Sequence, residues 1–398
     1  QSGDAGALRG LELSRRVCAE SLPAAVAAAT PPRAGDAGAP RLLCMVLTAW
    51  PKRDPYMRVA LESWMSQCDQ AAFLVSDDPN STARPPERFI TGEPYKVTDS
   101  YSNLALFPLS EARIIAINVT GGGRDCTGNN PTCWREGYLW RKVWQLYLKV
   151  YDLYIASALE EGGGGWTSVP EWFIKADDDS FLFVSHIRRH IQEQGLDPDE
   201  PHFMGRTLTH LKHKDLQGGM VSGNCLIMSR GAFKKLVEEM LVGIVERTAR
   251  DKAQAEARGQ EWNPNHILSP CIDRYGPAED LATSICFGMI NVTAKQVEDA
   301  EGRPKCLVMQ YRDHLLSKHG LSESGEPKDW FWANLDPSHE LAKCCPSLDE
   351  IFHLHSFKGA ERLRRMYEYH LLEQRLWEVK QEALAPLRQA CAALGVHV

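Results

Sequence analysis

Three consecutive carboxylates, Asp177, Asp178 and Asp179, lie between two apolar runs, 172–174 and 181–183. Buried carboxylates repel one another unless they are paired, protonated or bound to a cation. In an extended segment alternate side chains share a face, so Asp177 and Asp179 can point the same way. Oxygen ligands suit manganese or magnesium, which keep positions open for phosphate oxygens. The triplet therefore predicts a metal that binds a phosphorylated substrate, with a solvated acidic turn as the alternative.

Two later clusters can also do chemistry. Glu279 and Asp280 precede a predicted helix, where a carboxylate acts either as a helix cap or as a general base. His353 and His355 are two residues apart on a predicted strand, so they share a face and can contribute a metal ligand; lone histidines are more often structural. A hydrolase with Glu279 and Asp280 as paired carboxylates is disfavoured, because adjacent residues at a helix start diverge and the acidic triplet would lack a role.

The composition is that of an ordinary globular protein: 398 residues, 43% hydrophobic and 24% charged. A net charge of −7 argues against a nucleic-acid partner. The sequence contains no apolar run of 18 residues that would span a membrane. Because the chain begins at Gln1, we expect a processed or truncated product whose membrane attachment would depend on a preceding N-terminal anchor.

The cysteines and glycosylation triplets indicate an oxidising compartment. None of the 12 cysteines has the paired spacing of a zinc ribbon. Asn-x-Ser/Thr triplets begin at Asn80, Asn118 and Asn291. Together these features favour the secretory pathway.

Strands alternate with helices along the chain, which predicts an α/β sheet. Predicted strands cover 41–48, 71–76, 113–118 and 172–176, and an amphipathic helix with an aromatic stripe runs from Trp140 to Tyr154. Ligands of such sheets bind at the carboxyl ends of the strands, which is where the acidic triplet lies.

The predicted domain organisation has three parts: a stem at 1–38 that is rich in Ala, Gly and Pro, a catalytic domain at 39–372, and a helical extension at 373–398. Three segments of the catalytic domain look inserted, at 121–137, 161–169 and 246–263. A long helical stretch begins near Lys358, and we expect Pro386 to kink or break it.

Taken together, these motifs resemble those of a known family. They occur in the same order, namely 42–48, Trp64, Cys68, 172–179, 203–206, 222–223, 279–282, 330–332, 344–345 and 352–353. From about Arg41 to about Leu372 the chain resembles the core 1 β1,3-galactosyltransferases and, more distantly, the Fringe-type β1,3-N-acetylglucosaminyltransferases. The resemblance implies a GT-A fold, with a Rossmann-like mixed sheet flanked by helices. It also implies a metal-dependent, inverting Golgi enzyme that moves galactose from UDP-galactose to N-acetylgalactosamine on Ser or Thr.

The resemblance assigns roles to individual positions. Asp177 and Asp179 would form the Asp-x-Asp metal site with Mn²⁺ or Mg²⁺, His353 would complete the metal shell, and Asp280 would be the catalytic base. Donor binding is assigned to Thr48, Arg141, Lys175, Asp177 and Asp178, and acceptor binding to Glu279, Trp330 and Trp332. A surface salt bridge is the alternative role of Arg141. The expected partners are a UDP-sugar and an O-glycoprotein or glycopeptide acceptor, with a homodimer as a further expectation.

Departures from the family pattern keep other readings open. Segment 224–227 replaces a glycine-rich stretch, His355-Ser356 replaces the usual Val-Asp, and the insertion at 246–263 lies upstream of Asp280. Another UDP-sugar donor or another acceptor, as in Fringe-like transfer, is therefore an alternative. A non-catalytic chaperone or sugar-binding relative is a second alternative, although such relatives commonly lose the acidic motif that this chain keeps.

Disulfide pairings also follow from the resemblance. Cys44 with Cys68 and Cys271 with Cys286 match positions that look paired in relatives. The remaining expectations are Cys126 with Cys133, Cys306 with Cys344 or Cys345, and Cys18 and Cys391 either free or joining the stem to the last helix.

Overall fold

The computed structural model describes residues 38–49, 59–76, 94–95, 112–117, 138–156, 169–209, 211, 213–242, 250, 253–260, 278–309, 311, 314, 345–355, 357 and 359–393. The chain divides into two compact units, one of Arg33–Leu363 and one of Gln1–Pro32 with Arg364–Val398. The predicted insert at 121–137 and residues 161–168 of the predicted insert at 161–169 lie outside the described residues. The domain boundaries at 38 and 372 stay predictions.

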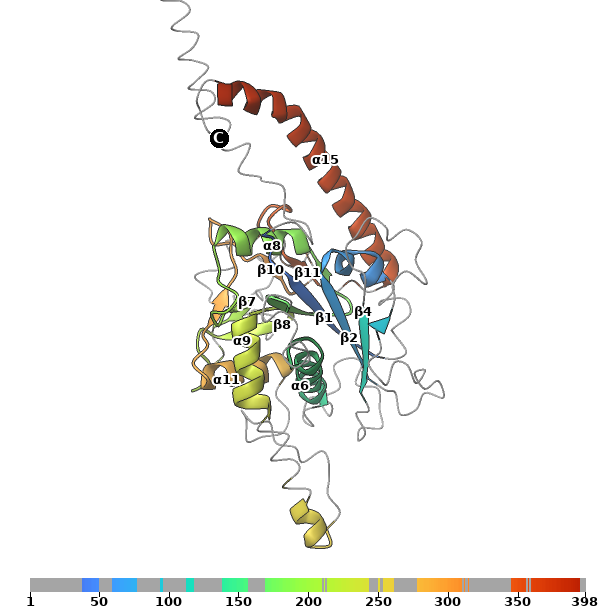
Figure 1. Ribbon diagram of the computed structural model, residues 1–398, viewed down its shortest axis with the longest axis vertical. Helices are drawn as coiled ribbons and strands as arrows, with labels where there is room; N and C mark the ends of the chain where they lie inside the picture. Colours follow the sequence, from blue (N-terminus) through green and yellow to red (C-terminus); the bar gives the residue numbers. More distant parts are fainter. Residues whose placement is uncertain are drawn as a thin grey trace, which may run out of the picture. The chain divides into compact units, whose positions relative to one another are not determined.

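An eight-stranded mixed sheet forms the centre of the larger unit, in the order β3-β4-β2-β1-β5-β8-β7-β9 (Figure 1). The bounds of these strands are β1 Leu42–Ala49, β2 Gln70–Ser76, β3 Pro94–Tyr95, β4 Ala112–Ile117, β5 Trp172–Asp177, β7 Phe203–Leu208, β8 Met220–Ser229 and β9 Ala294–Gln296. Strands β1, β2, β4 and β5 are mutually parallel, whereas β8 runs antiparallel to β5 and β7. The predicted α/β class with a mixed sheet is confirmed, and the arrangement is consistent with the GT-A fold.

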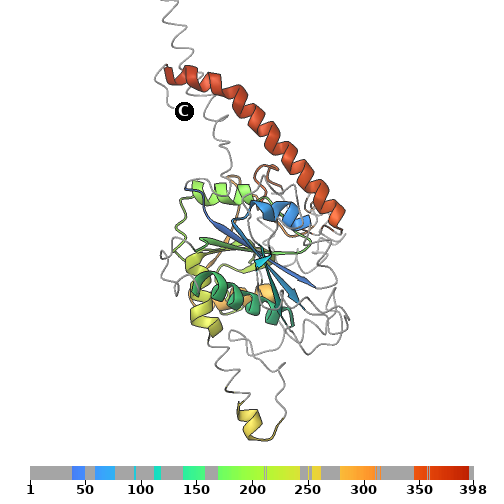
Figure 2. The ribbon, with the colours of Figure 1, turned by 45° about the vertical axis from the view of Figure 1, so that its right-hand side comes forward.

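Helices cover both faces of this sheet (Figure 2). One face carries α6 (Tyr138–Tyr151), which continues as a π-helical turn at Asp152–Ala156, together with α9 (Arg230–Lys235), a second π-helical turn η7 (Leu236–Leu241), and α11 (Glu279–Met289). The other face carries α8 (Val184–Glu193) and the 3-10 helix η2 (Trp64–Gln67). Each helix thereby buries its apolar stripe against the strands.

The aromatic stripe of α6 is part of the main hydrophobic core. Tyr147 packs edge-on against Phe233 of α9, with ring centroids 5.8 Å apart, and Phe173 of β5 stacks on Phe233 at 4.2 Å. Val143, Tyr147 and Val150 are fully buried. These side chains fill the layer between sheet and helices, as their spacing of three and four predicts.

A second sheet of three short strands brings two distant segments together. β11 (His353–Leu354) lies between β10 (Cys306–Leu307), to which it is parallel, and β6 (Phe181–Leu182), to which it is antiparallel. β6 begins four residues after Asp177, the last residue of β5. The second sheet therefore places the histidine-bearing segment beside the acidic triplet.

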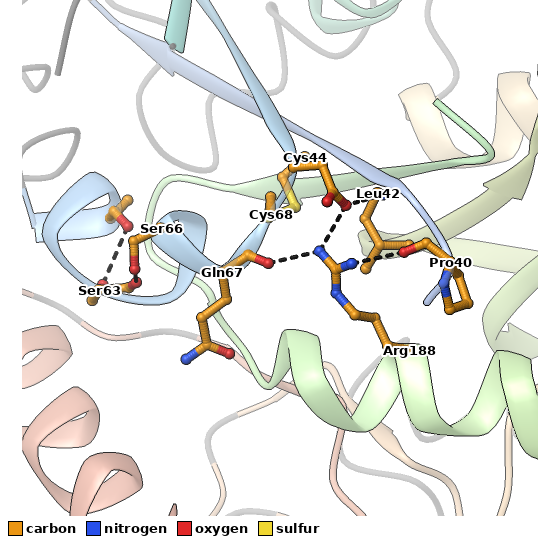
Figure 3. The surroundings of a disulfide bond; sticks show 10 residues. Pro40, Leu42, Cys44, Ser63, Ser66, Gln67, Cys68 and Arg188 are labelled. Atoms are coloured by element: carbon orange, nitrogen blue, oxygen red, sulfur yellow. Dashed lines mark hydrogen bonds and ion pairs between the residues drawn. A yellow bond between two sulfur atoms is a disulfide. The ribbon is translucent and has the colours of Figure 1, made fainter. Parts of the chain in front are cut away.

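Arg188 of α8 fastens the start of β1 to the segment that precedes β2 (Figure 3). Its guanidinium donates to the backbone oxygens of Pro40 and Gln67, each at 2.7 Å, and to Asp69 Oδ2 at 2.8 Å. The same Asp69 oxygen accepts the backbone N–H of Leu42 at 2.7 Å. The planar, multiply donating guanidinium is suited to joining several acceptors at once, and here it is 1% exposed.

The disulfides correct part of the sequence analysis. The predicted bond between Cys44 of β1 and Cys68 is present. Cys306 pairs with Cys225 of β8, so its predicted pairing with Cys344 or Cys345 is wrong. The fold explains the error, because it brings β10 beside β8, with Cα atoms of the two cysteines 6.2 Å apart, and sequence spacing does not reveal that adjacency.

Three further cysteines, Cys286, Cys345 and Cys391, are also disulfide-bonded, so the free alternative for Cys391 is wrong. Cys18, Cys126, Cys133, Cys271 and Cys344 lie outside the described residues.

The last helix, α15, spans Ala360–Ala393 and continues through Pro386, so the proline does not end it. Of the charged segment 246–263, the described residues 253–260 include a short helix with mostly exposed side chains, in line with a solvated excursion. Among the described residues, no helix combines the length and apolarity needed to cross a bilayer.

Candidate metal and catalytic site

The acidic triplet lies at the carboxyl end of β5, and its three side chains do not act alike. Asp177 ends the strand, and the turn that follows is closed by the Ser180 N–H bonding to the Asp177 carbonyl at 3.2 Å. Thr48, near the end of neighbouring β1, donates its hydroxyl to Asp178 Oδ2 at 2.9 Å. Asp178 thus accepts a hydrogen bond from β1, whereas Asp177 and Asp179 lie close to His355.

Asp177, Asp179 and His355 bring three ligand atoms within 4.8 Å of one another. His355 Nε2 lies 3.0 Å from Asp179 Oδ1 and 3.8 Å from Asp177 Oδ2. The side chains are 38%, 12% and 21% exposed for Asp177, Asp179 and His355, so a ligand can approach the cluster from solvent. Two carboxylates and one imidazole fit a divalent ion, and the nitrogen ligand favours manganese over the harder magnesium.

The His355 ring is oriented by a backbone acceptor. Its Nδ1 donates to the carbonyl oxygen of Val308 at 2.9 Å, which directs Nε2 toward the carboxylates. Metal-binding histidines are commonly fixed in this way through the second ring nitrogen. Burial lowers the pKa of His355, but the hydrogen bond that its ring donates to Asp179 and the charges of Asp177 and Asp179 outweigh burial and raise it. A proton on Nε2 therefore occupies the place that a metal would take.

His353, to which the sequence assigned the metal, lies in the interior instead. It is fully buried, pairs with Leu182 across the small sheet, and its Nε2 is 3.0 Å from Ser180 Oγ. Burial drives its pKa well below the ordinary value, so the ring is neutral. The structure groups His355 with the aspartates because it follows the end of β11, where the chain reaches the carboxyl edge of the main sheet.

Lys175 connects the acidic triplet to the start of α11. Its fully buried Nζ lies 2.5 Å from Glu279 Oε1, 2.6 Å from the Gly223 carbonyl oxygen and 3.4 Å from Asp177 Oδ1. Lys175 and Asp177 are two residues apart on β5 and so share a face of the strand. One cation thereby joins β5, β8 and α11 immediately beside the candidate metal cluster.

Charge pairing in this network determines the pKa of its members. Burial lowers the pKa of Lys175, but the carboxylates of Glu279 and Asp177 more than offset this and raise it above its ordinary value. Burial raises the pKa of Glu279 to about 7, although Lys175 opposes the shift. Glu279 was expected at the acceptor, but the structure places it 5% exposed and ion-paired inside the protein.

Asp280 is half-buried at the N-terminus of α11. Its Oδ1 accepts the N–H of Leu281 at 2.8 Å and its Oδ2 accepts the N–H of Gly223 at 3.3 Å. Burial raises its pKa, against the opposing effects of the Leu281 N–H, Lys175 and the Gly223 N–H. An oriented carboxylate with a raised pKa is suited to accept a proton from a hydroxyl group.

Gly223 leaves room for the Glu279 carboxyl group. A Cβ at this position would lie 2.2 Å from Glu279 Oε1, so a side chain here would displace that carboxyl group from its present place beside Lys175. The backbone of Gly223 also contacts two of the site's charged side chains: its carbonyl accepts from Lys175 and its N–H donates to Asp280. The sequence showed a Ser-Gly pair here but gave no sign of this bridging role.

The structure thus brings together six of the residues singled out by the sequence: Thr48, Lys175, Asp177, Asp178, Glu279 and Asp280. Asp179 joins them through His355. Trp330 and Trp332 lie outside the described residues, as does the side chain of Arg141. The His-x-His pattern in the sequence pointed to both His353 and His355, and the family resemblance then favoured His353. The Val308 carbonyl carries no signal in the sequence, because its contribution comes from the backbone.

The fold and this site define an α/β protein with an acidic metal-type cluster at the carboxyl ends of its strands. Over 202 residues, the chain is 26% identical to glycoprotein-N-acetylgalactosamine 3-beta-galactosyltransferase 1 of Xenopus laevis; the match covers 50% of this chain and 46% of the relative. The chain thus spans about half the length of this relative. The similarity supports the resemblance found in the sequence.

Among solved structures, the chain is similar to the glycosyltransferase GlyE of Streptococcus pneumoniae TIGR4, with a TM-score of 0.33 and 12% identity, over 87% of this chain and 64% of that one. It is also similar to the apo form of mouse xyloside xylosyltransferase 1, with a TM-score of 0.29 and 10% identity, over 76% and 96% of the two chains. No protein-family model matches the chain.

Proposed function

We propose that this chain is an inverting, metal-dependent β1,3-galactosyltransferase that moves galactose from UDP-galactose to O-linked N-acetylgalactosamine on Ser or Thr of glycoproteins. The observation that carries the proposal is the joining of two functional groups: the Asp177–Asp179–His355 cluster and the Asp280 carboxylate, linked through Lys175 and Gly223. The named substrates come from the similarity to the Xenopus relative.

The chemistry of inversion needs one displacement and one base. The acceptor hydroxyl oxygen forms a bond to the anomeric carbon of the donor sugar, and the bond from that carbon to the diphosphate oxygen breaks. The bonding electron pair leaves with UDP, and the hydroxyl proton passes to the Asp280 carboxylate. When bound by Asp177, Asp179 and His355, manganese supplies a Lewis acid for the negative charge on the diphosphate.

The surrounding residues hold these groups in position. Lys175 balances the charge of Asp177 and Glu279, and the backbone of Gly223 bonds to Lys175 through its carbonyl and to Asp280 through its N–H. Thr48 fixes Asp178, which keeps the turn of the triplet in one conformation. Preorganised groups of this kind lower the cost of reorganisation during the reaction.

The disulfides support an oxidising lumen, and we place the enzyme in the Golgi by analogy with the relative's substrate class. The homodimer stays a prediction.

The proposal is tested by UDP release from a panel of UDP-sugars with manganese and a peptide that carries N-acetylgalactosamine on Ser or Thr. Acceptor-dependent release from UDP-galactose, lost on chelation, is the expected result. Release from another donor would retain the mechanism and replace galactose, as in Fringe-like transfer. Tight UDP binding without turnover on any donor would favour a sugar-binding or chaperone role and contradict catalysis.

A further inference from the structure

Asn291 lies in an exposed turn that ends α11, at the opposite end of the helix from Glu279 and Asp280. Its N–H bonds to the Gly288 carbonyl at 3.1 Å, and the next N–H, of Val292, bonds to the Phe287 carbonyl at 2.9 Å. This pair of bonds is a Schellman motif, in which the residue after the cap takes a left-handed conformation. Asn291 has that conformation, with φ 57°. The backbone of the turn is therefore fixed while the Asn291 side chain faces solvent.

The same turn exposes the two polar residues of the triplet Asn291-Val292-Thr293, to which a glycan can be attached. Val292 is 2% exposed and anchors the turn in the core, whereas the residues on either side of it are exposed. Gln217 Nε2 lies 3.4 Å from Asn291 Oδ1, and the Thr293 hydroxyl donates to Gln217 Oε1 at 3.3 Å. Gln217 thus engages the amide oxygen of Asn291, whereas a glycan would be attached to its amide nitrogen, Nδ2.

We propose that Asn291 is an N-glycosylation site of this protein. The glycan donor is an oligosaccharide carried on a lipid diphosphate. A bond forms between Nδ2 and the anomeric carbon of the oligosaccharide, the bond from that carbon to the diphosphate breaks, the lipid diphosphate leaves with the electron pair, and one amide proton is released. The Asn-x-Thr pattern is the acceptor signal for this reaction, and the exposed turn supplies the surface position that it requires.

The location of Asn291 keeps such a glycan away from the candidate active site. α11 has 11 residues, which correspond to about 16 Å of helix between its two ends. The disulfides Cys44–Cys68 and Cys225–Cys306 indicate the oxidising lumen in which this modification takes place. The inference goes beyond the proposed transferase activity and does not depend on it.

The test uses the full chain, expressed in animal cells behind a cleavable secretion signal. The substitutions Asn80→Gln and Asn118→Gln remove the other two Asn-x-Ser/Thr triplets, so that Asn291 alone remains as an acceptor. We expect the secreted protein to lose mass on treatment with peptide N-glycosidase, with conversion of Asn291 to Asp detected by peptide mass spectrometry.

Two variants and one control separate glycosylation from folding. Asn291→Gly removes the acceptor and suits the positive φ, and Thr293→Ala removes the hydroxyl of the signal; both should abolish the mass loss. Thr293→Ser keeps the hydroxyl and should retain the glycan. If the Asn80→Gln, Asn118→Gln protein were secreted and lost no mass on treatment with peptide N-glycosidase, the proposal would be overturned, and Asn291 would be a helix-ending residue only. Galactosyl transfer is assayed separately on the same material, so its absence would bear on the proposed function alone.

Discussion

Replacement of Lys175 by Met tests the buried network that connects the two halves of the candidate site. The substitution removes a fully buried cation that contacts Glu279, Gly223 and Asp177. Glu279, itself 5% exposed, then remains as a buried carboxyl group without its cation. Breaking a buried ion pair on one side typically costs about 3–5 kcal/mol of the free energy of unfolding.

The pH dependence of this loss has a definite sign. In the wild-type protein the pKa of Glu279 is about 7, above its ordinary value of 4.5. Ionisation of Glu279 therefore lowers the free energy of unfolding as pH rises from 4.5 to about 7, and this effect is complete above pH 7. Without Lys175 the pKa rises again, and the loss continues above pH 7 at up to about 1.4 kcal/mol per pH unit. The gap between variant and wild type should therefore widen between pH 7 and pH 9.

The matched control replaces both partners, as Lys175→Met with Glu279→Leu. Exchange of a buried ion pair for apolar groups is often neutral, so most of the lost stability should return. The Gly223 carbonyl still lacks its donor, which leaves a deficit of about 1 kcal/mol. Urea denaturation of metal-free protein, followed by tryptophan fluorescence, measures all three chains. If Lys175→Met were as stable as wild type, or if the double variant were no more stable than Lys175→Met, the role of Lys175 as the buried partner of Glu279 would be refuted.

Three further predictions concern other parts of the chain. His355→Ala should weaken manganese binding, measured by calorimetry, by at least about tenfold, whereas His353→Ala should not, apart from its effect on folding; the reverse order would return the metal to His353. Arg188→Met should lower the free energy of unfolding by about 3–5 kcal/mol, because three acceptors lose a buried cation. Arg188→Lys keeps the charge and should cost less. An unchanged denaturation midpoint for Arg188→Met would contradict this expectation. His314 accepts the Met309 N–H, and burial together with the charge of Arg206 lowers its pKa from 6.5 to about 3. Below pH 6.5 the unfolded chain therefore binds more protons than the folded protein, and the free energy of unfolding falls, by about 2 kcal/mol at pH 5. His314→Gln should remove that component, and parallel pH profiles of the two proteins would count against it.

The sequence predicted the sheet well because buried parallel strands have a distinctive composition. The ends of the predicted runs at 41–48, 71–76, 113–118 and 172–176 agree with those of β1, β2, β4 and β5 within one residue. The carboxyl-end rule then located the acidic triplet correctly relative to the sheet.

What the sequence could not provide was the position of distant segments relative to one another. Choosing between His353 and His355 depends on where β11 ends: the predicted strand put both residues on one face, whereas the strand in the structure ends at Leu354, before His355. The bond between Cys225 and Cys306 depends on the adjacency of β8 and β10, which the 81-residue separation conceals. The contribution of Gly223 is made by its backbone, and a residue without a side chain carries no signal of that kind.

The role of Asp280 as the base that takes the proton of the acceptor hydroxyl is tested by comparing three chains. Transfer from UDP-galactose to the N-acetylgalactosamine peptide is measured with saturating manganese for wild type, Asp280→Asn and, as a control, Glu239→Gln on the surface-facing part of η7. We expect a β-linked product from wild type and from the control. For Asp280→Asn we expect a loss of at least about a hundredfold in kcat, with UDP binding retained. Turnover of Asp280→Asn equal to that of wild type would show that Asp280 is not the base.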